Sequence, residues 1–471
     1  MASRLTRFIV IESVSNNGHH AVRETTNPNA VIMRNESVFS TLIKIEAERA
    51  TSNNAYIHLR FCNTNRYWQR NSSSDAIVAQ SNKPSEDMSD RSCTLFEATV
   101  TGPDTFFLTH IQTGWRVVIL SNTTAFHLSP PSSVSANDGL LRFVNWDSLV
   151  HLPTHVAFQG SNDDFLKGIW AENAQFLQFA SSDPNELISN HRVQLMPDGH
   201  VRIYSDYFTR WWRFHNDWIW ASTMDPSIDD RNLLFWPIKV DNNTIALRSV
   251  GNNRICQLHS WGNINRCLNA AVTTITNEAR IRVHELVLNR SIYNVRYRME
   301  DARIYGETPY VAGTTTAANF SNEQGEVAVQ ITYQDSSSYT FSRSLSLTAG
   351  VTTTISAGVP LIAGATIEIG YQVNTTFEWG ESRSRTTSVT ATGTIPVPAR
   401  SVASVRYVAT MGTCDVPYSY TQQERSSTTG QITELDYDDG LFTGVSCYNF
   451  NFVVEKTTPL NHPSLNFALP N

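Results

Sequence analysis

The sequence predicts an all-β protein of three domains, and three observations support that prediction. The chain has 471 residues, which suggests about three domains at roughly 150 residues each. Thr, Ser, Asn, Val, Ile, Tyr and Trp are plentiful, and the long runs of Ala, Glu, Lys and Leu that favour helices are missing. A pattern in the first third recurs in the second third, and long alternating segments fill the last third.

The first two thirds of the chain contain an internal repeat. Residues 65–84 and residues 209–226 each hold an aromatic pair, a polar loop, an apolar run that ends in Ala, and a Pro. Tyr67 aligns with Trp211 in this comparison. Later matches keep an offset of about 140 residues that falls slowly, as loop deletions within a true duplication would produce.

Short strands with frequent turn signals fill both copies of the repeat. Turn signals such as SNNGHH, MPDGH and VGNNR come about every ten residues. That spacing is typical of an all-β barrel or a β-trefoil. We place the two copies at residues 1–150 and 151–288, and a third domain at residues 289–471.

Composition and motifs exclude several classes of function. The net charge is −7 without a basic stripe, so we expect no nucleic-acid partner. We find no nucleophile elbow, phosphate loop or metal-ligand spacing, and therefore expect no enzymatic activity, no metal and no cofactor. The chain has no apolar run of about 18 residues and no signal sequence, which predicts a soluble, cytoplasmic protein.

The six cysteines are spread two per predicted domain. Without a signal sequence, buried thiols are the simpler expectation. The pair Cys414 and Cys447 is the best candidate for a disulfide.

Several segments of the first 290 residues or so carry a resemblance to a known family. The segments NRYWQR, CTLFE, FVNWDSLVHLPTHVAFQGSNDDFLKG, SDYFTRWWRFHNDWIWASTMDP and INRCLNAA resemble those of amaranthin-type agglutinins, plant lectins with two tandem agglutinin domains. The resemblance implies two β-trefoils that bind galactose- or N-acetylgalactosamine-type sugars. In that family the sugar site lies where two protomers meet.

The second copy contains a turn with the residue types that a sugar site needs. Aromatic rings cover the apolar side of a sugar ring, and short polar groups bond its hydroxyls. The stretch WWRFHNDWIW supplies both, although core tryptophans beside an ordinary turn are the simpler interpretation. The candidate sugar-binding residues of this copy are Trp212, Arg213, His215, Asn216, Asp217 and Trp218.

The corresponding turn of the first copy lacks the rings. Ala76 and Ile77 stand where the resembling family has an aromatic pair, so sugar binding by this copy is in doubt. Its candidate hydroxyl-binding residues are Asn71, Ser72, Ser74 and Asp75.

The third domain has a different character, with long segments in which polar and apolar residues alternate. Residues 326–356 and 384–412 are longer than the usual strand of ~5–6 residues, which predicts an elongated antiparallel sheet. Within it, odd positions of residues 345–357 are apolar in six of seven places, and even positions carry Ser, Thr or Gly. The alternation resumes at residues 365–373.

This pattern predicts an amphipathic β-hairpin with its turn at residues 358–364. One apolar face is usual where an antiparallel sheet covers a soluble core, and it is also the pattern of a hairpin with lipid on one side. The first arm exceeds the roughly 9–11 residues that span a bilayer, and the expected tip is apolar, whereas turns are normally polar. The residues expected to face or enter lipid are Leu345, Leu347, Val351, Ile355, Val359, Pro360, Leu361, Ile362, Ile367, Ile369 and Tyr371.

The third domain resembles the pore-forming module of the aerolysin family. The resemblance is carried by SAGVPLIAG, by FEWGESRSRTTSV after it, and by the long Thr- and Ser-rich strands. It implies an elongated β domain that assembles into a ring and inserts its hairpin into a membrane. Because lipid tolerates no open sheet edge, several chains must each contribute a hairpin. Fusion of the two modules in this order resembles plant defence proteins.

Two functions follow from these expectations. The first is a glycan-binding, pore-forming protein with glycans, a target membrane and further copies of itself as partners. The alternative is a lectin whose third domain only mediates self-association, without pores.

Overall fold

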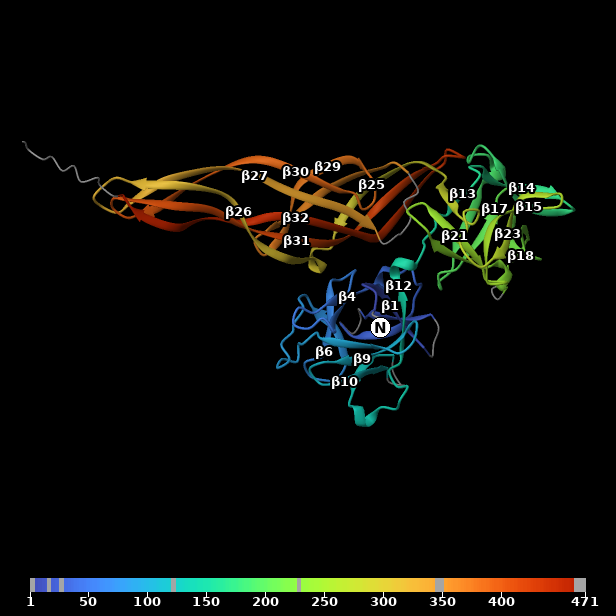
Figure 1. Ribbon diagram of the computed structural model, residues 1–471, viewed down its shortest axis with the longest axis horizontal. Helices are drawn as coiled ribbons and strands as arrows, with labels where there is room; N and C mark the ends of the chain where they lie inside the picture. Colours follow the sequence, from blue (N-terminus) through green and yellow to red (C-terminus); the bar gives the residue numbers. More distant parts are fainter. Residues whose placement is uncertain are drawn as a thin grey trace, which may run out of the picture.

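The computed structural model forms three β-sheets. The described residues contribute twelve strands to each of the first two sheets and eight strands to the third. In Figure 1 the third sheet forms an elongated domain, the second sheet lies at one end of it, and the first sheet lies below the half nearer that end. The described residues are 5–14, 18–24, 29–119, 124–226, 230–343 and 351–460.

The first domain is β-trefoil-like. Strands β1, β4, β5, β8, β9 and β12 pair in that order and close into a ring, because β12 also pairs with β1. The hairpins β2–β3, β6–β7 and β10–β11 extend from this ring and meet through three isolated bridges. The elements are β1 (Phe8–Ser13), β2 (His19–Arg23), β3 (Val31–Asn35), η1 (Thr41–Ile43), β4 (Ile45–Arg49), β5 (Tyr56–Phe61), β6 (Arg66–Arg70), β7 (Ile77–Ser81), β8 (Phe96–Val100), β9 (Thr105–His110), β10 (Trp115–Ile119), β11 (Phe126–Ser129), η2 (Pro131–Ser133), β12 (Leu141–Asn145) and η3 (Trp146–Ser148).

The second domain has the same strand pairing. Strands β13, β16, β17, β20, β21 and β24 close into a ring, and the hairpins β14–β15, β18–β19 and β22–β23 contact one another. The elements are β13 (His155–Gln159), β14 (Phe165–Ala171), β15 (Ala174–Ser181), η4 (Leu187–Ser189), β16 (His191–Leu195), β17 (Val201–Ser205), β18 (Arg210–His215), β19 (Trp218–Thr223), η5 (Arg231–Leu233), β20 (Phe235–Lys239), β21 (Thr244–Ser249), β22 (Arg254–Trp261), β23 (Ile264–Val272) and β24 (Ile281–Glu285).

The two domains share a detail of their second hairpins. In β6–β7, Trp68 pairs with Ala79, and the register shifts just before Trp68. In β18–β19, Trp212 pairs with Ala221 after the same kind of shift. Both tryptophans are fully buried in the separate cores of their domains. Equivalent bulges around equivalent core residues are what two copies of one domain are expected to show.

The elongated domain contains the longest strands of the chain. Strands β31 and β32 run over 26 and 28 residues and pair along their whole length, whereas strands usually have ~5–6 residues. The elements are β25 (Val287–Tyr297), η6 (Met299–Asp301), β26 (Arg303–Asn319), β27 (Gly325–Arg343), β28 (Thr353–Ala363), β29 (Thr366–Phe377), β30 (Ser382–Val397), β31 (Ser401–Ser426) and β32 (Ile432–Pro459).

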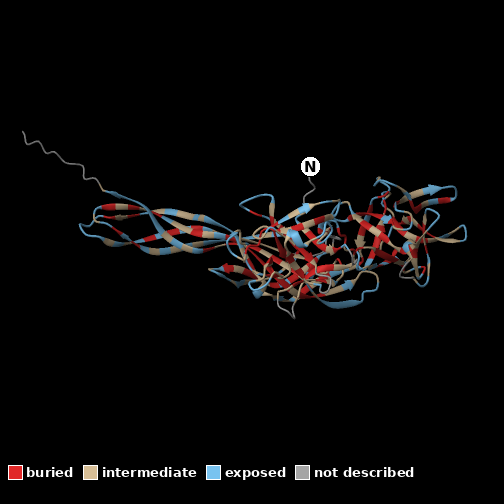
Figure 2. Cartoon of the chain, turned by 90° about the horizontal axis from the view of Figure 1, so that it is seen from below, coloured by how far each residue is buried: buried red, intermediate tan, exposed pale blue. Residues whose placement is uncertain are grey.

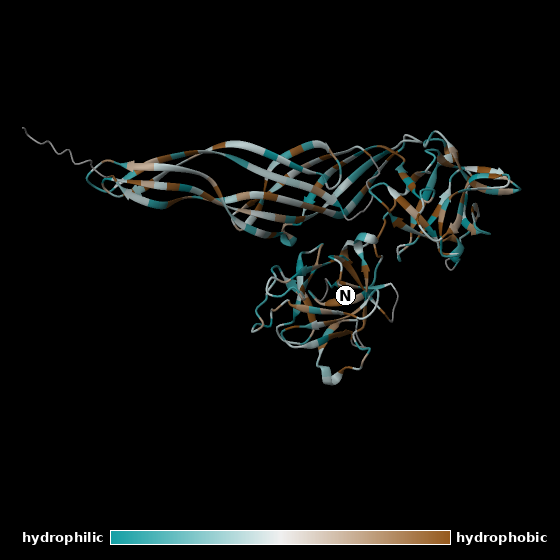
Figure 3. Ribbon diagram, in the orientation of Figure 1, coloured by the Kyte–Doolittle hydropathy of each residue, from teal (hydrophilic) through white to brown (hydrophobic). Residues whose placement is uncertain are grey.

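Two apolar clusters hold the elongated domain together. The larger lies at the end near the other domains and includes Ile355, Val416 and Phe442, while a smaller one at the far end includes Val329 and Val405. Figure 2 shows buried residues throughout the first two domains and mostly alternating burial along the long strands. Figure 3 shows the same alternation in hydropathy, which is the pattern expected of a sheet with one covered face.

One sequence expectation about the sheet of this domain is wrong. The sheet is not wholly antiparallel, because residues Arg290 to Ile292 of β25 pair in parallel with Thr353 to Ile355 of β28. All six cysteines are free thiols, as the sequence favours, and Cys414 and Cys447 form no disulfide. Cys414 pairs instead with Gly444, and Cys447 with Met411.

Candidate functional sites

The turn between β18 and β19 is a tight two-residue connection. Asn216 and Asp217 adopt φ values of 46° and 65°, and His215 pairs with Trp218 on either side of them. Positive φ at both central residues defines the turn type that joins twisted strands, and Asn and Asp tolerate it better than most residues. Both residues are exposed, so the turn presents an amide and a carboxylate to solvent.

Trp212 is a core residue and cannot touch a sugar, which corrects the sequence expectation. Its side chain has no exposed surface and packs against Phe158, His191 and Phe235. Successive residues of a strand face opposite sides, so Arg213 points outward. The Arg213 guanidinium is already ion-paired with Asp230, which leaves it less free for a ligand than the sequence suggested.

Rings and polar groups gather beside this turn, where Trp218 and Trp220 also pack edge-on against the buried Phe176. His215 stacks on Trp220 with ring centroids 4.1 Å apart. The ring centroids of Trp218 and His259 lie 5.9 Å apart, and both Trp218 and Trp220 are half-buried. The structure thus brings His215, Asn216, Asp217 and Trp218 together and separates Trp212 from them.

Two further residues join this surface from distant segments. Asn252 donates a hydrogen bond from Nδ2 to Asp217 Oδ1 at 3.4 Å and another to the Ala270 carbonyl at 2.7 Å. His259 arrives on β22. Neither residue lies near the WWRFHNDWIW stretch in sequence, and only the trefoil topology brings them to it.

In the corresponding turn of the first domain, the polar side chains mostly bond to neighbouring residues of the same hairpin. Asn71 Oδ1 accepts hydrogen bonds from the backbone and hydroxyl of Ser73, at 2.9 and 3.0 Å. Asp75 is ion-paired with Arg70 at 2.5 Å, and the Arg70 guanidinium lies 5.6 Å from the centre of the Trp115 ring. The remaining two candidates are exposed at the tip of this turn: Ser72 and Ser74.

A polar pocket of about 220 Å³ opens at a different place in the second domain. Its lining includes Gln159, Asp163, Asp241 and Arg282, and Gln159 Oε1 accepts a hydrogen bond from Arg282 at 2.7 Å. The pocket lacks an aromatic ring among its lining residues, so it offers hydroxyl partners without a face for the sugar ring.

The predicted amphipathic hairpin is present as β28–β29, but its turn lies elsewhere. Ala363 pairs with Thr366, and Gly364 adopts a positive φ of 67°, so the turn lies at residues 364–365. The predicted tip is wrong: Val359 to Ile362 belong to strand β28. Val359 and Ile362 are 0% and 4% exposed, so these residues form no apolar exposed tip.

The apolar face of the hairpin is covered by the elongated domain itself. Ile355, Val359 and Ile362 are buried in the larger cluster beneath the hairpin, and Ile367 and Tyr371 pack against it. The opposite face carries exposed residues such as Glu368. Leu345 and Leu347 lie outside the described residues, and Val351 is half-buried.

A bulge interrupts the hairpin at Gly370. Val359 pairs with Tyr371, but the next residue, Pro360, pairs with Ile369, so Gly370 has no partner. A side chain at Gly370 would have its Cβ 2.3 Å from Leu361 Cδ1, which explains the glycine. The bulge turns Ile369 away from the covered face and leaves it 45% exposed.

Comparison with known protein families identifies the first domain. Residues 8–126 match the family model of the agglutinin domain. The chain therefore carries an agglutinin domain, which confirms the amaranthin-type resemblance for the first copy.

Comparison with solved structures gives only distant likenesses. The parasporin-2 toxin of Bacillus thuringiensis, which recognizes cancer cells, is 19% identical over 36% of this chain and 74% of its own, with a TM-score of 0.23. A lamprey immune protein is 12% identical over 67% and 94%, with a TM-score of 0.28. An aerolysin-like protein of Bombina maxima is 13% identical over 36% and 99%, with a TM-score of 0.24.

Two other comparisons are negative. No curated protein sequence matches the chain. Among the residues that the structure describes, no helix is long and apolar enough to cross a membrane.

Proposed function

We propose that this protein binds glycans on a target membrane and then forms a pore there. The agglutinin domain binds galactose- or N-acetylgalactosamine-containing glycans, and residues 151–288 form a second domain of the same kind. The elongated domain, residues 289–471, is an aerolysin-like module that assembles with further copies and inserts the hairpin β28–β29. A role in plant defence is part of the same proposal.

The observation that carries this proposal is the register of the two strands that flank the hairpin. Strands β27 and β30 pair without a bulge from Gly325 with Val397 to Thr340 with Ser382. The midpoint of every such pair is Leu361. If this register continued beyond Thr340, the chain would form one long hairpin whose turn lies at Leu361. That position coincides with the apolar tip that the sequence predicts.

Continuation of this register also places most apolar residues of the two arms on one face of the hairpin. Residues that pair in it have the same parity, so the odd-numbered residues of both arms lie on one face. That face would hold Val351, Ile355, Tyr371 and, without the bulge, Ile369. Outside the tip at residues 359–363, the other face would hold Ser, Thr, Gly, Asn, Gln and Glu side chains. A lipid-facing side and a water-facing side result from a single register.

The folded hairpin uses a different register and keeps the same apolar residues away from water. Its pairs have midpoints near residue 365, about four residues later in the chain. The bulge at Gly370 allows this alternative packing on the larger cluster. Two registers on one segment are what a hairpin needs if it is to be soluble first and membrane-bound later.

Glycan binding supports pore formation through local concentration. A single sugar site is usually weak, but several sites on one membrane-bound assembly increase the apparent affinity without new contacts. The agglutinin match and the surface of His215, Asn216, Asp217 and Trp218 support this part of the proposal.

A matched pair of substitutions tests the pore. Dye release is measured from vesicles that carry a glycolipid with terminal N-acetylgalactosamine. Val351→Asp places a charge on the lipid-facing side, where a charged residue destabilises the inserted barrel in each chain of the assembly. Thr352→Asp places the same charge on the adjacent, water-facing position. We expect Val351→Asp to abolish release and Thr352→Asp to preserve it. Equal release by both variants would show that Val351 does not face lipid.

The same vesicles distinguish a lectin that only self-associates. Such a protein would bind the glycolipid and form oligomers without releasing dye. Inserted pores should also give oligomers that resist SDS after incubation with vesicles, because their strands are hydrogen-bonded between chains.

A further inference from the structure

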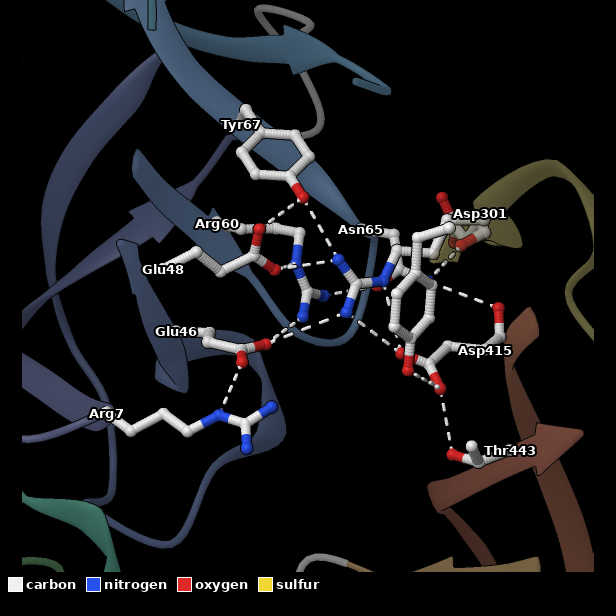
Figure 4. Close-up of polar contacts among 11 residues, drawn as sticks. Arg7, Glu46, Glu48, Arg60, Asn65, Tyr67, Asp301, Asp415 and Thr443 are labelled. Atoms are coloured by element: carbon white, nitrogen blue, oxygen red, sulfur yellow. Dashed lines mark hydrogen bonds and ion pairs between the residues drawn. The ribbon is translucent and has the colours of Figure 1, made fainter. Parts of the chain in front are cut away.

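The first domain contacts the elongated domain through polar groups. Asn65 donates a hydrogen bond from Nδ2 to the Asp301 carbonyl at 2.6 Å, and Arg66 donates one to the Glu300 carbonyl at 2.7 Å. Arg298 of the elongated domain donates to the Asn63 carbonyl at 3.4 Å. Figure 4 shows Asn65 beside a group of buried charged residues that includes Glu46, Arg60 and Asp415.

Arg303 is the centre of that buried group and joins the two domains. Its guanidinium donates to Glu48 Oε1 at 2.7 Å and to the Tyr67 hydroxyl at 3.0 Å, both in the first domain. On its own domain it contacts Asp415 Oδ2 at 3.1 Å. The Arg303 side chain is only 7% exposed. We call Glu46, Glu48, Arg60, Tyr67, Arg303 and Asp415 the interdomain latch.

Neighbouring cations keep Glu48 of the latch in its ionised form. Arg60 forms ion pairs with both Glu46 and Glu48 on the side of the first domain. Burial opposes the ionisation of Glu48, but the nearby charges of Arg60 and Arg303 outweigh it and lower the pKa of Glu48 to about 2. Acid conditions above that value therefore leave Glu48 charged.

The contact is built so that it can open. Among the described residues, no apolar cluster includes both the first domain and the elongated domain. On opening, Arg60 stays with the two glutamates, and Arg303 stays with Asp415, so neither side is left with an unpaired charged residue. Polar interfaces of this kind between domains permit relative motion by default.

The strand that carries Arg303 also supports the hairpin. Ala302 and Ile304, on either side of Arg303, pack against the larger cluster beneath β28–β29. Successive residues of a strand point to opposite faces, so Arg303 points towards the latch while its neighbours point towards the cluster beneath the hairpin. A cavity of about 580 Å³ lies between Asn82 and Lys83 of the first domain and residues 364–367 at the hairpin turn.

We propose that the interdomain latch is an autoinhibitory contact, in which the first agglutinin domain holds the hairpin in its folded register until the domain is drawn away. The inference rests on the proposed pore-forming function and names its regulation. Glycan binding at a membrane would separate the two domains. The first domain is then held by the membrane glycan while the elongated domain must reorient to assemble with other copies, so the docked arrangement is no longer kept.

The variant Arg303→Met tests the latch. It leaves Glu46, Glu48 and Asp415 buried together with too few cations, and removing one partner of a buried ion pair shifts such an equilibrium by on the order of a hundredfold or more. We expect small-angle scattering to show an undocked first domain. We also expect dye release from the glycolipid vesicles to become at least about tenfold faster, on the view that docking limits insertion.

Two further variants keep the test informative. Asn65→Gly removes the hydrogen bonds to the Asp301 and Asp415 carbonyls at a position with φ of 51°, which glycine adopts without strain, so this variant should fold and show a smaller acceleration. Val405→Ala is the matched stability control. It weakens the distant apolar cluster of the elongated domain without touching the first domain, and its release rate should stay unchanged.

The outcomes separate the latch from the pore. An undocked Arg303→Met protein that releases dye no faster than the parent would overturn the autoinhibitory role. A docked Arg303→Met protein would show that Arg303 does not hold the domains together. If the parent and every variant bind the vesicles but none releases dye, the pore proposal fails, and the scattering result still decides whether the latch exists.

Discussion

Two pairs of engineered cysteines distinguish the folded register of the hairpin from the register proposed for the membrane. In the folded protein Ala357 pairs with Val373. If the β27–β30 register continues, the partner of Ala357 becomes Ala365, because both are four residues from Leu361. The double variants Ala357→Cys/Val373→Cys and Ala357→Cys/Ala365→Cys therefore report different states of the same segment.

The separation between the two states is large. A residue advances about 3.3 Å along a strand, so eight residues between positions 365 and 373 correspond to roughly 26 Å. A disulfide requires the two Cα atoms to lie within about 7 Å. The pair that can be bridged in one register is therefore far beyond reach in the other, and the two cross-links exclude each other.

The assay is mild oxidation before and after incubation with glycolipid vesicles, with the linked peptides identified by mass spectrometry. Identification of the peptides also accounts for the native thiols, of which Cys62 and Cys447 are half-buried and the others buried. We expect the 357–373 bridge to form only in solution and to block dye release until it is reduced. We expect the 357–365 bridge to form only on vesicles. Recovery of the 357–373 bridge from dye-releasing pores would refute the register argument.

Three further predictions concern the second domain. Trp212→Ala should lower the free energy of unfolding by about 3–5 kcal/mol in chemical denaturation, since it empties a fully buried site. Trp218→Ala should weaken glycan binding by about 1 kcal/mol in a glycan array or calorimetry while the domain stays folded. Burial lowers the pKa of His191 to about 4, so the neutral form is favoured in the folded state. The contribution of His191 to the free energy of unfolding should be complete above pH ~6.5 and fall by about 3 kcal/mol towards pH ~4. The variant His191→Gln should show a weaker dependence of the unfolding free energy on pH over this range.

Alternation in the sequence predicts the faces of the hairpin but not its turn. Ile355 and Tyr371 lie on the covered face as their parity predicts. A period of two is preserved when a strand slips by two or four residues, so alternation alone cannot select among such registers. The bulge at Gly370 and the packing of Leu361 decide the folded turn, and both depend on tertiary contacts.

Residue types mark the candidate sugar-binding turn of the second domain, but they do not show which of its residues reach the surface. The polar turn with flanking rings marks the segment, yet Trp212 and Trp218 differ only in which side of their strands they occupy. Ile219 and Ala221 alternate with Trp218 along the strand, so the sequence predicts that Trp218 faces away from the core. The bulge beside Trp212 breaks this alternation, so the sequence does not predict which way Trp212 faces.

The interdomain latch has no signal in the sequence. Arg303 lies 255 residues from Glu48 and 112 residues from Asp415. Each of these residues taken alone looks like an ordinary surface charge, and such contacts become visible only once the domains are placed in space.

The packing of the hairpin also determines how the protein loses its folded state during storage. The covered face of β28–β29 is held by one local cluster that is separate from both trefoil cores. Local clusters open more often than whole domains, and irreversible loss that follows such openings is governed by a rate rather than by global stability. The useful lifetime of a preparation should therefore be limited by premature exposure of Ile355, Val359 and Ile362, followed by aggregation. On the proposed function, an aged preparation should still bind the glycolipid vesicles but release less dye.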